Sequence, residues 1–192
     1  MNRRNLLKLG GSFALNGLLV AGGTAALLQP AGAVPALQRA PAIARDVRLL
    51  SFVNTHTGER FADAYWEAGN YLPDAMAAIN QVMRDHRSGE VHAIDPRLLD
   101  QLHRLKGEVS ASAPFQIISG YRSPATNAAL HENSSGVATR SLHMEGRAID
   151  VRVAGVDLTR LRDAAIAMQS GGVGYYDASN FIHVDTGRVR RW

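Results

Sequence analysis

Two short stretches of the chain carry side chains that could do chemistry together. The first, SLHMEGRAIDVRV at residues 141–153, holds His143 and Asp150 with a glycine in the segment between them. The second, FIHVD at residues 181–185, holds His183 and a further aspartate. Imidazoles and carboxylates are zinc ligands and proton carriers, so the function depends on whether the fold brings the two stretches together.

Both stretches alternate like strands that have one packed face. In the first, the aliphatic side chains share one face and Asp150 lies on the other. In the second, two aliphatic residues lie opposite His183 and Asp185. If the strands lie side by side, Asp150 and His183 converge, and the preceding loop can fold His143 over them.

A His-Asp-His set without thiolates has the ligand types of a zinc site whose fourth position is open to water. Such a site lowers the pKa of water toward ~7 and polarises a carbonyl group, which is hydrolytic chemistry. A hydrogen-bonded histidine–carboxylate pair without a metal is the alternative, and from the spacing alone it is the more common arrangement. The remaining histidines have no acidic partner on an alternating strand and are left out of the site: His56, His86, His92, His103 and His131.

Four motifs in this order resemble a known family: SGYRSPATN, SLHMEGRAID, GGVGYYD and FIHVDTG. They look like the zinc peptidases related to D-Ala-D-Ala carboxypeptidases, whose signature joins a serine, a histidine, a glycine, an alanine and an aspartate to a distant histidine. A wider match includes LSFVNTHTGER, RDHRSGEVHAIDPRLLDQL and TGRVRRW. It is similar to the YcbK-like periplasmic murein endopeptidases and covers the chain from about residue 46 to residue 192.

The resemblance implies one Zn²⁺ per chain, held by His143, Asp150 and His183. It implies that Arg122 lies near the zinc, contacts substrate and stabilises negative charge on the scissile carbonyl oxygen. A surface arginine that caps a turn is the alternative for Arg122. Ser141 resembles a serine that contacts substrate or fixes the loop, and ordinary turn chemistry explains it equally well.

The general base does not follow the family pattern. Many relatives place an acid or a histidine two or three residues before the last ligand, where this chain has Phe181 and Asn180. Asp185 is the best remaining carboxylate, either as the catalytic group that accepts a proton from the water or as a group that orients His183. Two weaker candidates lie in turns: Glu145 and Asp177.

The activity implied by the resemblance is zinc-dependent hydrolysis of peptide crosslinks in bacterial peptidoglycan. The sequence does not distinguish a D-Ala to diaminopimelate crosslink from a diaminopimelate to diaminopimelate crosslink. Two alternatives stay open: a D,D-carboxypeptidase or dipeptidase acting on small cell-wall peptides, and a non-catalytic zinc-containing module that binds the cell wall.

The first 33 residues have the composition of an export signal, with a basic start, an apolar middle and an Ala-x-Ala ending. Arg3-Arg4 followed by an apolar stretch resembles the twin-arginine signal. We therefore expect residues 1–33 to be a cleaved leader, residues 34–45 a linker, and the mature protein to be periplasmic. An uncleaved membrane anchor is the alternative, because residues 9–28 contain no charge.

Charge and cysteine content exclude several classes of protein. Three of the 21 basic residues and none of the 17 acidic ones lie in the expected leader, which leaves 18 against 17, a net charge of +1. No basic tract remains to bind nucleic acid, and no membrane contact is expected beyond the leader. With no cysteine, an exported chain has neither disulfides nor thiolate metal sites.

Residues 46–192 are expected to form a single zinc peptidase domain. The sequence predicts a hairpin around Thr55–Gly58, then helices near 73–89, 95–107 and 157–169. Strands are expected in PFQIISGYR, in RAIDVRV and on either side of Asp177–Asn180, with a helical or irregular segment after the first. These elements favour an α+β fold with an antiparallel sheet and helices on one side, and the resemblance implies a hedgehog/D-Ala-D-Ala peptidase-like arrangement.

Overall fold

The computed structural model describes residues 46–133 and 138–192, so the expected leader and linker lie outside the described residues. The described strands are β1 (Val47–Asn54), β2 (Arg60–Glu67), β3 (Asn70–Tyr71), β4 (Phe115–Ser119), β5 (Ala148–Val153), β6 (Gly172–Tyr176), β7 (Phe181–Asp185) and β8 (Arg190–Arg191). The helices are α1 (Pro73–Val82), α2 (Pro96–Glu108), α3 (Pro124–Asn133) and α4 (Leu158–Ala167), with short 3-10 helices η1 (Leu142–Glu145) and η2 (Asp177–Ser179).

The strands form one sheet in the order β3-β2-β1-β4-β5-β7-β6-β8. Most neighbours are antiparallel, but β1 pairs with β4 and β6 pairs with β8 in parallel. The predicted α+β class is confirmed, whereas the prediction of an entirely antiparallel sheet is wrong. The reason is that β1 and β4 are joined through α1 and α2, and a long connection of this kind can bring a strand back in the same direction.

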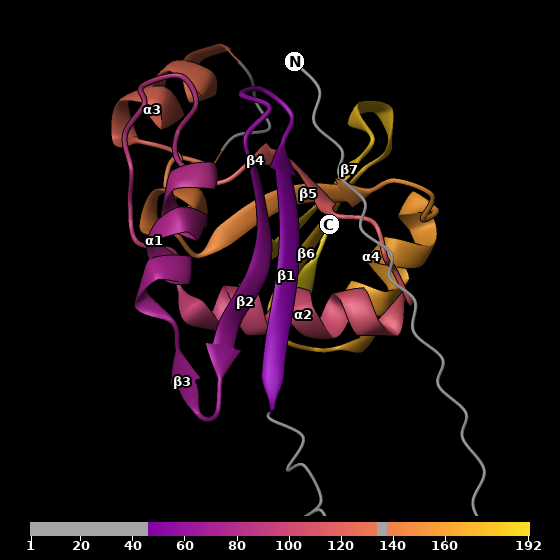
Figure 1. Cartoon of the computed structure of the whole chain (residues 1–192). Coiled ribbons are helices and arrows are strands. Elements are labelled where there is room, and N and C mark those ends of the chain that lie inside the picture. The colour runs from indigo at the N-terminus through magenta and orange to yellow at the C-terminus, as the bar shows by residue number, and fades with distance from the viewer. Residues whose placement is uncertain (1–45, 134–137) are drawn as a thin grey trace, which may run out of the picture. The chain divides into compact units, whose positions relative to one another are not determined.

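One face of the sheet forms the hydrophobic core. Its central strands supply these buried apolar side chains: Leu50, Phe52, Phe115, Ile117, Ile149, Val151, Ile182 and Val184. Helix α2 adds a buried row of leucines, at positions 98, 99, 102 and 105. Helix α1 contacts β1 and β2, α2 contacts β1, and α4 contacts β5, β6 and β7 (Figure 1). The opposite face of β5 and β7 is left for polar side chains.

The local signals read from the sequence mostly hold. The β1–β2 hairpin forms, and α2 and α4 begin after Asp95 and Asp157, whose side chains accept hydrogen bonds from backbone N–H groups of the first turn. Helix α1 is shorter than predicted and ends at Val82. The chain then turns around the buried Asp85, which accepts hydrogen bonds from the backbone of Arg87 and Ser123.

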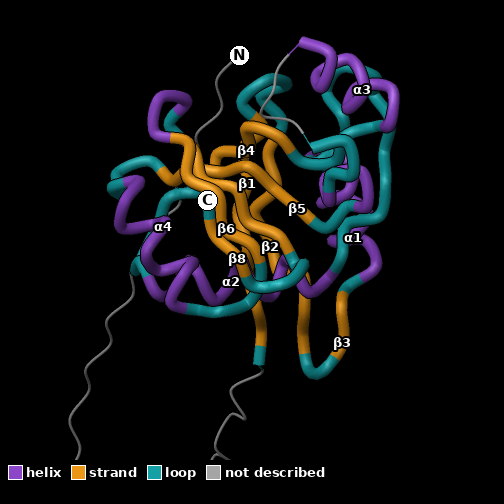
Figure 2. Tube along the Cα trace, turned by 180° about the vertical axis from the view of Figure 1, so that it is seen from behind, coloured by secondary structure: helices purple, strands orange, loops and turns teal. Residues whose placement is uncertain are grey.

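Helix α3 lies toward the top of the views in Figures 1 and 2, whereas α2 crosses the lower half. Residues 138–147 precede β5 and include Ser141 and η1, whereas Arg122 lies between β4 and α3. Among residues 46–133 and 138–192, no helix combines the length and the apolar character that crossing a membrane requires.

Candidate metal centre

The pairing of β5 with β7 brings the two chemical stretches together. These strands are antiparallel, and Asp150 is directly opposite His183 in the register. Ile149 and Val184 form the neighbouring pair, and their side chains point into the core on the other face. Because side chains alternate along a strand, burying the aliphatic residues on one side fixes Asp150 and His183 together on the other.

The short helix η1 positions His143 beside this pair. The Ser141 side chain accepts a hydrogen bond from the backbone N–H of His143, and η1 ends at Gly146 in the left-handed conformation. A Cβ atom on Gly146 would overlap the carbonyl oxygen of Ala93, so this turn requires glycine for both conformation and space.

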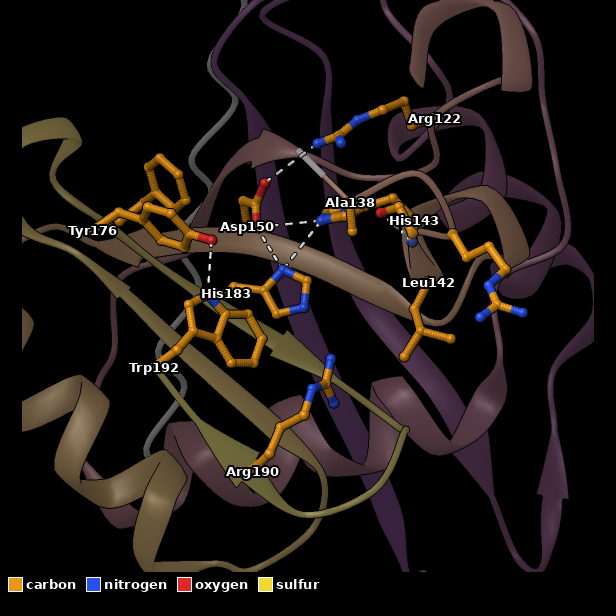
Figure 3. Close-up of a pocket in the computed structure, with 12 residues that line it drawn as sticks. Arg122, Ala138, Leu142, His143, Asp150, Tyr176, His183, Arg190 and Trp192 are labelled. Atoms are coloured by element: carbon orange, nitrogen blue, oxygen red, sulfur yellow. Dashed lines mark hydrogen bonds and ion pairs between the residues drawn. The ribbon is translucent and has the colours of Figure 1, made fainter. Parts of the chain in front are cut away.

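Three potential ligand atoms meet at the centre (Figure 3). His143 Nε2 lies 3.2 Å from His183 Nδ1 and 3.3 Å from Asp150 Oδ1. His183 Nδ1 lies 2.9 Å from the same carboxylate oxygen. All three residues are buried, and among the described residues they are the one group of three or more such side chains close enough to hold an ion.

The outer hydrogen bonds fix the tautomer of each imidazole. His143 Nδ1 is 2.7 Å from the carbonyl oxygen of Gly120, and His183 Nε2 is 2.9 Å from Asp185 Oδ2. Both partners can only accept, so these nitrogens carry the protons. The inner nitrogens of neutral rings then present lone pairs to each other and to Asp150.

Three acceptors facing one point require a cation or a proton between them. Tetrahedral zinc, with bonds of about 2.0–2.1 Å to nitrogen and oxygen, would separate its ligand atoms by about 3.3 Å, close to the separations found here. The donor set of two imidazoles and one carboxylate fits zinc and also suits other divalent transition metals.

The pKa shifts of His183 and Asp150 also favour a bound cation at this site. Burial lowers the pKa of His183, but the hydrogen bonds with Asp150 and Asp185 outweigh that effect and raise the pKa to about 9. Burial alone would raise the pKa of Asp150, yet the neighbouring His143 and His183 hold it well below its usual range. The site therefore keeps its carboxylate ionised and attracts positive charge.

Asp185 lies behind His183, on the far side of the ring from the triad. It is fully buried and accepts hydrogen bonds from Gly172 N, Gly187 N and the Arg190 guanidinium, at 2.7–3.1 Å, as well as from His183. The imidazole stands between Asp185 and the three inner ligand atoms. Of the two roles expected for Asp185, the geometry favours orienting His183 over accepting a proton from water.

Arg122 lies at the edge of the centre and is largely buried. Its Nη2 atom is 3.8 Å from Asp150 Oδ2, and its Nη1 atom donates to Asn127 Oδ1 at 3.3 Å. Its backbone N–H donates to the carbonyl oxygen of His143, which ties it to η1. Burial lowers the pKa of Arg122, but a guanidinium stays charged at neutral pH.

The centre opens into a pocket of about 520 Å³. Besides the triad, the pocket is lined by Arg122, Ala138, Arg140, Ser141, Leu142, Tyr176, Phe181, Arg190 and Trp192. The sequence-predicted Arg122 and Ser141 thus face the same space as the triad, whereas Asp185 does not line it. Neither of the weaker base candidates lines the pocket: Glu145 pairs with Arg147, and Asp177 accepts a hydrogen bond from Tyr175.

Sequence reasoning missed the aromatic and arginine side chains at the other wall of the pocket. Tyr176 and Trp192 are joined by a hydrogen bond, and Arg190 packs over the Trp192 ring while pairing with Asp185 (Figure 3). The motifs GGVGYYD and TGRVRRW drew attention to these segments. They gave no role to single residues, because only the pairing of β8 with β6 brings the end of the chain to the site.

Comparisons with known proteins agree on one family. Residues 42–192 match the Peptidase_M15_2 model, described as "Peptidoglycan L,D-endopeptidase MepK". The chain is 42% identical over 191 residues to the protein of that name from Escherichia coli strain K12, covering 100% of this chain and 97% of the relative. It is 42% identical over 146 residues to a "Probable peptidoglycan L,D-endopeptidase MepK" from Haemophilus influenzae, covering 76% of this chain and 78% of the relative. No solved structure matches the chain.

Proposed function

The chain belongs to the Peptidase_M15_2 family of peptidoglycan L,D-endopeptidases, and we propose that it is a zinc-dependent enzyme that hydrolyses peptide crosslinks in bacterial peptidoglycan. Metal dependence is supported by one observation: lone pairs of His143, Asp150 and His183 converge on one point at the base of a pocket. One zinc ion per chain would be held by His143 Nε2, Asp150 Oδ1 and His183 Nδ1.

The relatives' names narrow the bond that is cut. A crosslink from D-Ala to diaminopimelate joins two D-configured centres. A crosslink between two diaminopimelate residues joins an L-configured centre to a D-configured one. Because the relatives are named L,D-endopeptidases, the second crosslink is the proposed substrate.

The pocket supports an acidic peptide as substrate. Three arginines line it, whereas Asp150 is the one acidic side chain among its described lining residues. Crosslinked stem peptides carry free carboxylates, which arginine binds through paired hydrogen bonds. This argument applies to Arg140 in particular, because Arg190 already pairs with the buried Asp185.

Each residue of the site has a separate part in the proposed reaction. The ion, when bound, supplies a Lewis acid and makes hydroxide available near neutral pH. Arg122 faces the same pocket and stabilises negative charge that develops on the scissile carbonyl oxygen. Asp185 accepts a hydrogen bond from the Nε2 proton of His183, which leaves Nδ1 unprotonated and turned toward the point that the ion would occupy. Ser141 fixes η1 and presents its side chain to the pocket.

The proposed location is the periplasm, reached by the twin-arginine route through residues 1–33. The fold of residues 46–192 is proposed to be of the hedgehog/D-Ala-D-Ala peptidase-like type. Its support is the family membership and the position of the triad on the polar face of the sheet.

Digestion of purified muropeptide dimers tests the function. The zinc-loaded protein should cleave diaminopimelate to diaminopimelate dimers faster than D-Ala to diaminopimelate dimers, and a chelator or His183→Ala should lower the rate at least ~1,000-fold, because the triad acts as a unit. His56→Ala, on the exposed β1–β2 turn, serves as the matched control and should retain full activity. Undiminished cleavage in the presence of chelator would refute metal dependence.

The same digest separates the alternatives. Release of terminal residues from monomers without cleavage of dimers would indicate a carboxypeptidase. Zinc-loaded protein that binds peptidoglycan sacculi but cleaves neither substrate would indicate a binding module.

A further inference from the structure

Tyr176 lines the pocket with a polar group that the proposed mechanism does not use. Apart from the triad and the arginines, three of the described lining residues have a side-chain group that can donate a hydrogen bond: Ser141, Tyr176 and Trp192. Tyr176 is the last residue of β6, and its hydroxyl points into the space beside Asp150 (Figure 3).

Two contacts hold the Tyr176 ring. It is paired with Phe181 across β6 and β7, and the two rings stack with their centroids 4.7 Å apart. Trp192 Nε1 donates a hydrogen bond to the Tyr176 hydroxyl at 2.9 Å. The side chain is therefore preorganised, and no reorientation is needed when substrate binds.

The direction of this hydrogen bond matters. An indole N–H can only donate, so the tyrosine oxygen is the acceptor and its own proton is left for another partner. Among the described residues, no hydrogen bond uses that proton. The proton is available to an acceptor that enters the pocket.

Tyr176 and Arg122 enter the pocket from opposite sides of Asp150 (Figure 3). Both side chains line the pocket that holds the triad. A carbonyl group held over the triad would thus have one donor on each side. This is the arrangement that stabilises an oxyanion, for which preorganised donors must converge on the position that the charge will occupy.

We propose that Tyr176 is a further catalytic residue, whose hydroxyl donates a hydrogen bond to the oxyanion of the tetrahedral transition state opposite Arg122. Trp192 is a positioning residue that acts through Tyr176. The inference rests on the proposed peptidase function.

The variant Tyr176→Phe removes the hydroxyl and keeps the stacked ring. Because a single oxyanion donor contributes ~100-fold or more to kcat, kcat on the crosslinked dimer should fall by about that factor while KM changes little. Affinity for a phosphinate analogue of the dimer, which mimics the tetrahedral state, should fall by a similar factor. Zinc content and the thermal unfolding midpoint should equal those of the wild type.

Tyr175→Phe is the matched control. This neighbouring hydroxyl bonds Asp177 and lies outside the pocket that holds the triad, so its removal should leave kcat and phosphinate affinity unchanged. Trp192→Phe keeps an aromatic ring beside His183 but removes the N–H donor. It should lower kcat less than Tyr176→Phe does, and it should cause no further loss when combined with Tyr176→Phe.

The outcomes distinguish this inference from the function on which it rests. A zinc-loaded wild type that cleaves no dimer overturns both. A wild type that is active and chelator-sensitive, with Tyr176→Phe retaining kcat and phosphinate affinity within about threefold, overturns the role of Tyr176 alone. An effect confined to KM would also overturn it, because that pattern signifies ground-state binding.

Discussion

At the scale of single residues, the chemistry depends on which nitrogen of each histidine carries the proton. His143 is oriented by a neutral carbonyl and His183 by a carboxylate. A carboxylate partner makes the imidazole a stronger electron donor than a carbonyl does, so the two ligands are not equivalent. The same carboxylate, Asp185, also pairs with Arg190, which links the site to the last strand.

The stability of the metal-free protein should fall as the pH rises. The pKa of His183 is about 9 in the folded protein against an ordinary 6.5, so folding favours its protonated form. That contribution to the free energy of unfolding is complete below about pH 6.5 and is lost as the pH passes through about 9. Its full size is roughly 3 kcal/mol. Urea denaturation with chelator present, at several pH values across this window, measures it.

His183→Gln is the control for this measurement. The variant has no imidazole at this position, so its stability should change less across the same window. An equal fall in wild type and variant would contradict the assignment and would point to other titrating groups.

At the scale of elements, η1 is the part of the site most sensitive to local conformation. It is four residues long, begins after the Ser141 cap and ends at Gly146. The backbone carbonyl of Gly146 accepts a hydrogen bond from Asp95 N, which attaches η1 to the start of α2. The position of His143 therefore depends on a turn that only glycine fits.

Gly146→Ala and Gly155→Ala form a matched pair that tests this dependence. Both glycines have positive φ, but a Cβ on Gly155 meets nothing, whereas one on Gly146 overlaps Ala93. Gly155→Ala should cost about 1 kcal/mol of stability from backbone strain alone, with unchanged zinc affinity. Gly146→Ala should cost more and lower zinc affinity ~10-fold or more, because His143 shifts. Denaturation and zinc titration measure both effects, and equal zinc affinity in the two variants would show that η1 tolerates the change.

At the scale of the whole molecule, the residues that stabilise the fold and the residues of the metal centre lie on opposite faces of the sheet. One face of the central strands packs against α1, α2 and α4, and the other face carries the triad. Two of the ligands, Asp150 and His183, come from strands that are paired on both edges, so the backbone under these two ligands has little freedom to move. Such rigidity suits a site in which three atoms must converge within a few tenths of an ångström.

Export of the whole chain should depend on the arginine pair in the leader. Replacing Arg3 and Arg4 with lysine should leave most of the protein in the cytoplasm at full length, because the twin-arginine route reads that pair. The wild type should be periplasmic and shorter by the expected leader. The same exchange at Arg39 and Arg45 is the control and should not alter export. Cell fractionation with mass measurement tests this prediction. A double lysine variant found in the periplasm would refute the twin-arginine assignment.

The sequence by itself determined the local elements and the chemical groups. Alternation in RAIDVRV and FIHVD separated Asp150 and His183 from their aliphatic neighbours, and helix starts were predicted near residues 95 and 157, as the structure has them. These features follow from residue periodicity and short-range hydrogen bonds, which a linear sequence records directly.

Only the tertiary structure decided the strand order, the parallel strand pairs and which further side chains lie around the triad. The sequence left Asp185 with two roles, and its place behind His183 favours one of them. The roles proposed for Tyr176 and Trp192 depend on the return of β8 to pair with β6, which brings Trp192 to the Tyr176 hydroxyl. Pairing between distant strands depends on how all the elements bury their apolar faces at once, and no local pattern in the chain encodes that balance.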